Sequence, residues 1–369
     1  MSKTTQRLEV QAGRPLAAQP GVGHNRWHPD IEPRARVPAG TSLVIETLDA
    51  MDGQLTPESD AGTVASSNLN RVHPLSGPVH VDGAAPGDLL VVTITAIETQ
   101  SFGFTAQIPG FGFLRDVFPD PFYVAWTIHD HVAESPTLPG VRIPEAAFMG
   151  IVGVAPSAEL LAGITKRERE LFERGGAVHP PDPRDAIPDD PSVAAAGLRT
   201  TPPREIGGNL DVRHVGAGCT LFLPVFVDGA RFSCGDMHFA QGDGEVCGTA
   251  IEVAGQVHLT VDLRKGAATG RRAKGVWFQT EEPARRAPRA VFATTGGCVD
   301  DEGRNHSENA SLAARNALLS MIEHIVEDRG YTAQQAYAIC SVAVNLQLSQ
   351  TVDVPNYTAT ALLPLEIFV

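Results

Sequence analysis

The side chains best suited to chemistry lie in one short stretch, residues 233–252. Within it, glycines rather than helix-forming residues separate the acidic and imidazole side chains, which are Asp236, His238, Asp243, Glu245 and Glu252. Asp236 and His238 are two positions apart, so on an extended chain both side chains leave the same face. Carboxylates and an imidazole on one face are suitable ligands for a divalent ion. The alternative is an acidic turn in which Asp243-Gly244 joins two strands and the charges face water.

Two further polar residues have the same spacing. Asn209 and Asp211 follow the glycine pair Gly207-Gly208 and are two positions apart. They can therefore share a face of an extended segment. This arrangement makes them candidates to join the group at 233–252.

Three histidines in the first eighty residues are candidates for a pocket. Prolines 29 and 33 oppose a helix around His24 and His28, so their four-residue spacing does not predict a helical metal pair. Either ring could reach a pocket from a loop, or both could lie in a surface loop that Trp27 anchors. His73 opens the segment His73-Pro-Leu-Ser-Gly-Pro78, which suits a pocket wall or a plain strand connection.

The five cysteines argue against a disulfide framework. Their number is odd and no two form a Cys-x-x-Cys pair, which also disfavours a structural zinc ribbon. Cys234 and Cys247 lie within the acidic stretch and are alternative nucleophiles. Cysteines in such positions are more often small buried apolar residues.

Composition limits the classes of partner. The chain has 369 residues and a net charge of −14, which disfavours nucleic acid and anionic membranes as partners because phosphate recognition relies on clustered Lys and Arg. No apolar run approaches the length needed to span a bilayer, and the first twenty residues lack the apolar core of a signal peptide. We therefore expect a cytoplasmic, enzyme-sized protein.

The rest of the chain predicts the elements that must position these residues. Strands are predicted at 37–47, 85–94, 148–156, 220–229 and 255–263; the first two are near copies of a Pro-turn-strand unit. Helices are predicted at 160–174, 307–328 and 332–347, the second ending at Gly330 and the third beginning with a capping box. The Phe- and Gly-rich segment 102–126 is either an apolar wall over a substrate or core, and we expect core for most of its rings.

Prolines and aspartates dominate residues 176–204, which predicts a long loop or lid. It separates an N-terminal, mainly β region (1–175) from a C-terminal α+β region (205–369) that carries the acidic stretch. The glycines in 148–156 predict a buried strand that the backbone of another segment approaches closely.

Several blocks of the chain resemble the acetamidase/formamidase family, in the order that the family has them. They are His-Asn-Arg-Trp-His-Pro-Asp-Ile (24–31), Val-His-Pro-Leu-Ser-Gly-Pro-Val (72–79), Ala-Pro-Gly-Asp-Leu-Leu-Val-Val (85–92), Gly-Gly-Asn-Leu-Asp (207–211), Gly-Asp-Met-His-Phe-Ala-Gln-Gly-Asp-Gly-Glu (235–245) and Ser-Val-Ala-Val-Asn-Leu-Gln-Leu-Ser-Gln-Thr-Val-Asp (341–353). The block at 235–245 is the most specific. The sequences at 24–27 and 241–244 resemble formamidases more than short acetamidases.

The resemblance implies hydrolysis of formamide, or another short aliphatic amide, to the carboxylate and ammonia. It also implies a mainly β fold with an α+β portion and a β-sandwich-like core, assembled as a homo-oligomer that is trimeric or built from dimers. Family members are associated with a divalent metal, and zinc is the first expectation here.

We assign roles on this basis. Asp211, Asp236 and His238 are expected to hold the metal, and Glu245 or Glu252 to move the proton of the attacking water, with Asp243 as a third catalytic candidate. Asn209, His24 and His73 are expected to bind the substrate. Two alternatives stay open: an amidase with a cysteine nucleophile, and a non-catalytic β protein that binds a metal or an amide.

Overall fold

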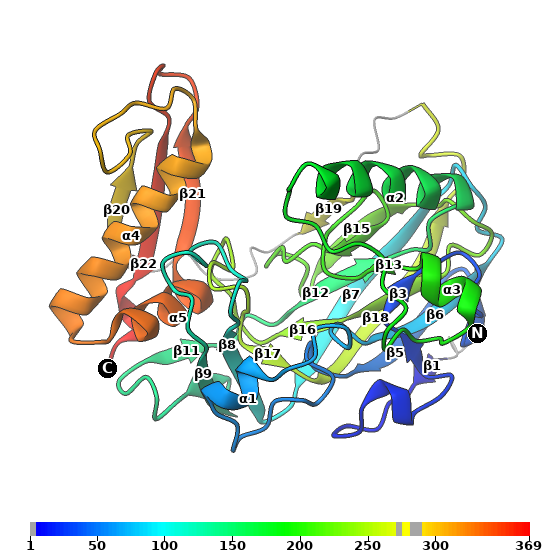
Figure 1. Ribbon diagram of the computed structural model, residues 1–369. Helices are drawn as coiled ribbons and strands as arrows, with labels where there is room; N and C mark the ends of the chain where they lie inside the picture. The colour runs from blue at the N-terminus through cyan, green and yellow to red at the C-terminus, as the bar shows by residue number, and fades with distance from the viewer. Residues whose placement is uncertain (1–4, 271–274, 281–289) are drawn as a thin grey trace.

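Two large β-sheets and a smaller αβ unit make up the chain (Figure 1). The structure is a computed structural model that describes residues 5–270, 275–280 and 290–369. The predicted mainly β fold is confirmed.

The first sheet has six strands in the order β1 (Thr5–Leu8), β5 (Thr41–Thr47), β18 (Gly255–Arg264), β7 (Leu89–Thr99), β15 (Cys219–Pro224) and β19 (Trp277–Thr280). β1 is parallel to β5 and the other pairs are antiparallel. The two Pro-turn-strand units predicted from the sequence become β5 and β7, which flank β18 on its two edges.

The second sheet has eleven strands. Its main path runs through β11 (Arg142–Pro144), β10 (Val132–Glu134), β9 (Phe122–His129), β8 (Phe102–Gln107), β17 (Glu252–Val253), β16 (Phe232–His238), β12 (Phe148–Gly153) and β14 (Gly207–Asn209). Strand β6 (Leu75–Asp82) pairs with β16, β2 (Gly23–His24) and β4 (Ala35–Pro38). All of these pairs are antiparallel except β4 with β6. β16, which carries Asp236 and His238, therefore lies at the centre of this sheet.

One apolar core joins the two sheets. Alternate residues of β5 and β7, such as Ile45 and Val92, belong to the same buried cluster as Val79 of β6 and Phe232 of β16. Each fully buried aliphatic or aromatic side chain of this kind stabilises the fold by roughly 1.5–3 kcal/mol. The core is β-sandwich-like, as predicted.

The segment 176–204 follows α2 (Ala158–Glu173) and is mostly irregular. It contains α3 (Pro191–Ala196) and β13 (Leu198–Arg199), which pairs with β3 (Arg26–Trp27). The Arg26 guanidinium donates to the carbonyls of Asp182 and Arg184, both at 3.0 Å. The segment is thus held against the residues that follow His24 by strand pairing and hydrogen bonds.

Short helices complete this part of the chain: α1 (Ala61–Ala65) and the 3₁₀ turn η1 (Leu16–Ala18). In both sheets, strands that precede residues 176–204 in the chain pair with strands that follow them. β15 and β18 pair with β7, and β16 pairs with β6 and β12. The acidic stretch is consequently supported by strands from both halves of the sequence.

The αβ unit lies to one side of the sandwich (Figure 1). Its antiparallel sheet has the order β20 (Val291–Gly296), β22 (Thr358–Pro364) and β21 (Asn345–Gln350), covered by α4 (Ala310–Arg329) and followed in the chain by the 3₁₀ turn η2 (Leu365–Ile367). α4 begins three residues later than predicted because Asn309 caps it, and it ends at Gly330 as predicted. α5 (Ala333–Ala343) has the predicted capping box but ends before 347, where β21 takes over. Every helix in the described ranges is too short or too polar to cross a bilayer.

Candidate active site

Strand pairing brings the predicted residues of β16 to a carboxylate from another strand. His238 is directly opposite Glu252 of β17, and Phe148 of β12 faces it on the other side. Asp236 and His238 leave the strand toward the same group of side chains, with His238 Nε2 3.3 Å from Asp236 Oδ1 and 3.2 Å from Glu252 Oε2. The shared face predicted from the two-residue spacing is therefore present.

A glycine on β12 makes room for a second pair of residues. Asn209 of β14 is opposite Ile151, and the backbone N–H of Leu210 donates to the Gly150 carbonyl at 2.9 Å. A Cβ at Gly150 would lie 2.7 Å from Asp236 Oδ2 and 2.8 Å from Asp211 Oδ1. Gly150 is thus required for the two carboxylates to approach each other, which bears out the close backbone approach predicted from the glycines of this strand.

Gln241 orients two members of the group and was missed in the sequence. His238 Nδ1 is 3.0 Å from Gln241 Oε1, an acceptor, so Nδ1 carries a proton and Nε2 is the nitrogen that faces the carboxylates. Gln241 Nε2 donates to the backbone carbonyl of Asp211 at 2.9 Å. One amide therefore fixes both the imidazole and the Asp211 backbone, a kind of outer-shell support that is common around metal-binding histidines.

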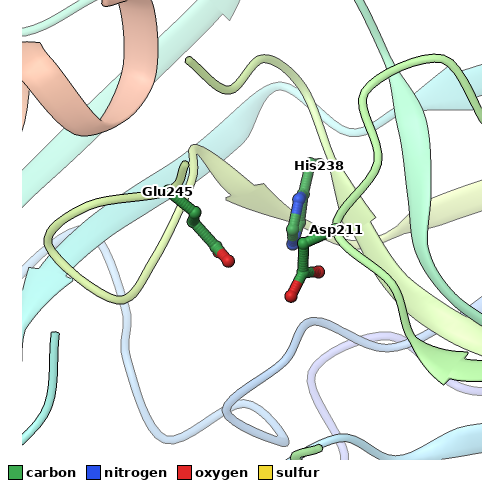
Figure 2. A group of neighbouring side chains, drawn as sticks. All are labelled: Asp211, His238 and Glu245. Carbon is green, nitrogen blue, oxygen red and sulfur yellow. The ribbon is translucent and has the colours of Figure 1, made fainter. Parts of the chain in front are cut away.

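Five side chains meet here, and we refer to them as the acid–histidine group: Asp211, Asp236, His238, Glu245 and Glu252. Figure 2 shows Glu245 pointing across toward Asp211 and His238. The potential ligand atoms of Asp211, His238 and Glu245 lie within 4.8 Å of one another, and so do those of Asp236, His238 and Glu252. The three predicted metal ligands are divided between these two overlapping sets, which have His238 in common.

The backbone at this site is strained. Asp211, Asp236, Glu245 and the nearby His73 have φ values between 44° and 56°, in the left-handed region that residues with side chains rarely adopt. Such conformations cost roughly 1–3 kcal/mol each and cluster at functional sites. Their coincidence at four predicted site residues favours a functional rather than a structural role for the group.

Burial and mutual repulsion perturb the acids. Burial, and then the neighbouring Asp236, raise the pKa of Asp211 to about 7, and burial raises the pKa of Glu252 to about 7. The pKa of Glu245 is also well above its usual value, because of burial and then of Asp211. Burial alone would lower the pKa of His238, but Glu252 and Asp236 outweigh it and raise that pKa well above its usual value.

Several polar atoms of the group are buried without a hydrogen-bond partner in the described part of the chain. They are Asp211 Oδ1, Asp236 Oδ1, His238 Nε2 and Glu252 Oε2, joined at the edge of the group by Asn209 Oδ1. Most buried polar atoms of folded proteins are paired. Carboxylate and amide oxygens that converge unpaired on one point are arranged to receive a ligand with positive charge or with N–H groups.

A cavity of about 540 Å³ opens onto this group. Asp211, Asp236, Glu245 and Glu252 line it, whereas His238 is reached through Asp236 and Glu252. The predicted substrate-binding residues Asn209 and His73 also line the cavity, and His73 Nδ1 has no partner among the described residues. Phe111, from the segment in which we expected mostly core, is an exposed member of the lining.

His24 does not reach the cavity. Its strand pairs with β6, and both ring nitrogens are occupied: Nδ1 donates to the Arg26 carbonyl at 2.6 Å and Nε2 is 2.7 Å from Ser233 Oγ. Burial lowers the pKa of His24 to about 4, so the ring is neutral. The structure therefore assigns His24 to the support of β16 rather than to substrate.

Asp243 is also placed apart from the group. Its side chain is 46% exposed and lies 3.8 Å from Arg213. The turn that carries it directs Glu245, two residues later, into the cavity instead. The alternative of a solvated acidic turn thus holds for Asp243 but not for Glu245.

The cysteines do not offer an activated thiol. All five are buried, and neither Cys234 nor Cys247 lines the cavity. Burial raises the pKa of Cys234 to about 12 and raises that of Cys247 above its usual value. A nucleophilic cysteine needs the opposite environment, one that stabilises the thiolate.

The chain is similar to proteins of one known family. The model of the acetamidase/formamidase family matches residues 9–369. A formamidase from Methylophilus methylotrophus is 37% identical over 95% of this chain and 90% of its own length. An acetamidase from Mycolicibacterium smegmatis is 38% identical over 90% of this chain and 88% of its own length.

Solved structures show the same fold. A gamma lactamase from Delftia acidovorans superposes with a TM-score of 0.93 and is 36% identical, and the match covers 98% of this chain and 93% of the lactamase. A protein from Thermoanaerobacter tengcongensis that is described as a predicted acetamidase/formamidase has a TM-score of 0.58 and is 25% identical, and the match covers 98% of this chain and 96% of that protein.

Proposed function

This chain belongs to the acetamidase/formamidase family and is an amide C–N hydrolase, and on that premise we propose that it hydrolyses small carboxamides with water activated at the acid–histidine group. The observation that carries the proposal is the convergence of four carboxylates and one imidazole, with unpaired polar atoms, at one end of a cavity. Formamide, the substrate expected from the sequence, is the smallest member of the class.

The acid–histidine group has the donors that a divalent cation requires. Its unpaired oxygens and nitrogen converge, and the missing side chain at Gly150 leaves space between two of the carboxylates. We propose Asp211, Asp236 and His238 as the ligands and zinc as the ion, since zinc accepts both nitrogen and carboxylate ligands. Such an ion, when bound, supplies positive charge that polarises an amide carbonyl and lowers the pKa of water.

Glu245 is the best-placed proton acceptor. It lines the cavity and is less buried than Glu252, and burial raises its pKa, which suits a carboxylate that must accept and release a proton. It takes a proton as water adds to the carbonyl carbon. The same proton then passes to the amide nitrogen, so that the C–N bond breaks with ammonia rather than an amide anion as the leaving group.

Glu252 and Asn209 have different tasks. Glu252 Oε1 accepts the backbone N–H of Ala250 at 2.8 Å and Oε2 faces His238, so this carboxylate holds the imidazole in place. Asn209 lines the cavity, and its buried Oδ1 has no partner among the described residues. It can accept a hydrogen bond from the substrate NH₂ group, which turns the carbonyl carbon toward the attacking water.

The test is ammonia release from formamide, acetamide, propionamide and urea, with added zinc and after chelation. We expect release from the carboxamides, loss on chelation and recovery with zinc. Asp236→Asn and His238→Ala should lose bound metal and at least a thousandfold in rate, whereas Asp262→Asn, on the exposed side of β18, should change neither. If both site variants keep metal and full activity, the proposal is wrong.

Two earlier alternatives are weaker. A cysteine mechanism is disfavoured by the buried thiols with raised pKa, and alkylation of the native protein should leave activity unchanged. A non-catalytic binding protein does not agree with membership of a family of amide hydrolases. The homo-oligomer stays a prediction.

A further inference from the structure

The cavity is much larger than formamide requires. Its volume of about 540 Å³ falls within the range of roughly 300–1,000 Å³ that pockets for organic ligands occupy. Formamide has only three non-hydrogen atoms, and a water molecule, which has one, occupies about 30 Å³ in the liquid, so formamide needs roughly 100 Å³ or less. A formamide at the acid–histidine group would leave most of the cavity to solvent.

Much of the cavity lining is apolar. Six side chains form what we call the apolar wall: Met51, Leu69, Val72, Ile108, Phe111 and Phe113. A surface of this composition gains free energy by covering an aliphatic or aromatic group and gains nothing from water.

Three of the six side chains of the apolar wall belong to the folded core. Met51, Val72 and Ile108 are 3%, 8% and 8% exposed and belong to a small core cluster that also holds Phe104 and Tyr123. Leu69 packs against that cluster and is only partly buried. The part of the wall formed by Met51, Val72 and Ile108 is therefore held in place by the core, so binding a substrate there does not have to order these side chains.

Phe111 closes the rim of the wall. It is 36% exposed and lies between Gly110 and Gly112, both in the left-handed region. A Cβ at Gly248, at the other side of the rim, would lie 2.5 Å from the Phe111 ring. The glycine at 248 thus allows this ring to lie against the segment that carries Glu245, and an apolar chain leaving the acids would meet it.

The chemistry around the cavity favours an uncharged chain. Four carboxylates at one end repel an anionic substituent. Two arginines also line the cavity, fewer than the four carboxylates. The two terminal nitrogens of Arg199 donate to Asn70 and to the Leu69 carbonyl, and Arg115 Nη1 donates to the Gly112 carbonyl at 3.2 Å, so these hydrogen bonds hold the lining rather than a carboxylate.

Building on the proposed function, we propose that the preferred substrates are primary amides with an apolar acyl group of several carbons, and that Leu69 and Phe111 set that preference. The carboxamide lies at the acid–histidine group and the acyl chain along the apolar wall. Formamide is a poor substrate of the same site because it makes no contact with the wall.

The experiment compares kcat/KM for formamide, acetamide, butyramide and hexanamide. Burial of each added CH₂ should raise kcat/KM by about fourfold from acetamide onward. Leu69→Trp, which fills the cavity, should lower kcat/KM for hexanamide at least tenfold and leave formamide within twofold. Leu171→Trp, on the exposed side of α2, is the matched control and should change neither.

Phe111→Ala tests the wall by removing a contact instead of filling space, and it should also lower kcat/KM for hexanamide selectively. The inference is overturned if kcat/KM is highest for formamide and falls with each CH₂, or if both wall variants affect all amides equally. In those cases ammonia is still released and the proposed function stands. Absence of ammonia from every amide would instead refute the proposed function.

Discussion

Two buried histidines, one on strand β16 and one hydrogen-bonded to it, differ in what surrounds them. His24 and His238 are both 1% exposed. His24 has both nitrogens hydrogen-bonded, to the Arg26 carbonyl and the Ser233 hydroxyl, and burial lowers its pKa to about 4. His238 faces two carboxylates with an Nε2 that has no hydrogen-bond partner in the described ranges, and its pKa is raised.

Burial therefore does not distinguish a structural histidine from a functional one, but the satisfaction of the surrounding polar atoms does. A network whose hydrogen bonds are all made stabilises one conformation. Buried carboxylate oxygens without hydrogen-bond partners cost free energy, so their presence suggests that a ligand binds there. Substitutions in the two regions should accordingly affect different quantities: activity around His238, and stability around His24.

The largest expected effect is the loss of activity in Glu245→Gln. The amide is isosteric with the carboxylate but cannot take the proton of water, so kcat should fall roughly 10²–10⁴-fold, the usual contribution of general acid–base catalysis. Because Glu245 is proposed as a proton acceptor and not a ligand, bound metal should stay unchanged. Steady-state kinetics and metal analysis of the same preparation check both. Loss of the metal would move Glu245 into the ligand set.

His24→Ala should affect stability and leave catalysis nearly unchanged. It removes two buried hydrogen bonds and leaves the Ser233 hydroxyl and the Arg26 carbonyl without them, and each such group costs about 1–3 kcal/mol. We expect the free energy of unfolding in urea to fall by roughly 3–4 kcal/mol, with kcat/KM of the folded protein within twofold of the original. A stable variant with a large loss of kcat/KM would restore His24 to the substrate site.

The same histidine should make the fold sensitive to acid. Its pKa in the folded state, about 4, lies below the ordinary value of 6.5, so the folded state disfavours the proton. The stability it contributes is complete above about pH 6.5 and is lost as the pH falls toward 4, by about 1.4 kcal/mol per pH unit. His24→Gln cannot titrate, so between pH 7 and 4.5 its stability should fall by roughly 2–3 kcal/mol less than that of the original chain. Urea titrations at the two pH values measure this difference, and equal losses would contradict it.

Local patterns in the sequence predict much of what this comparison rests on. The spacing of Asp236 and His238 predicts their common face, and the glycine pair before Asn209 predicts a second polar edge. Helix α5 follows from the Thr332–Gln335 capping box. In each case neighbours within a few residues determine the geometry, so one segment is enough.

What the sequence does not reveal are contacts between distant segments. The direction of His24 depends on the pairing of β2 with β6, and the approach of Glu252 to His238 on the register of β16 and β17. The role of Gly150 appears only when β14 lies beside β12. A change of one residue in strand register moves a side chain to the other face, so these contacts require the assembled sheet.

The smallest effect is expected for Asp243→Asn, which tests whether the active site extends to this residue. Asp243 and Glu245 are two residues apart on one turn, yet Asp243 is about half exposed and 3.8 Å from Arg213 while Glu245 lines the cavity. An exposed ion pair contributes about 0–1 kcal/mol, so the free energy of unfolding should fall by less than about 1 kcal/mol. Because the Asp243 carboxylate does not reach the acid–histidine group, kcat/KM should stay within twofold of the original. A tenfold or larger loss of kcat, measured beside Glu245→Gln, would show that Asp243 acts in catalysis after all and that the turn moves when substrate binds.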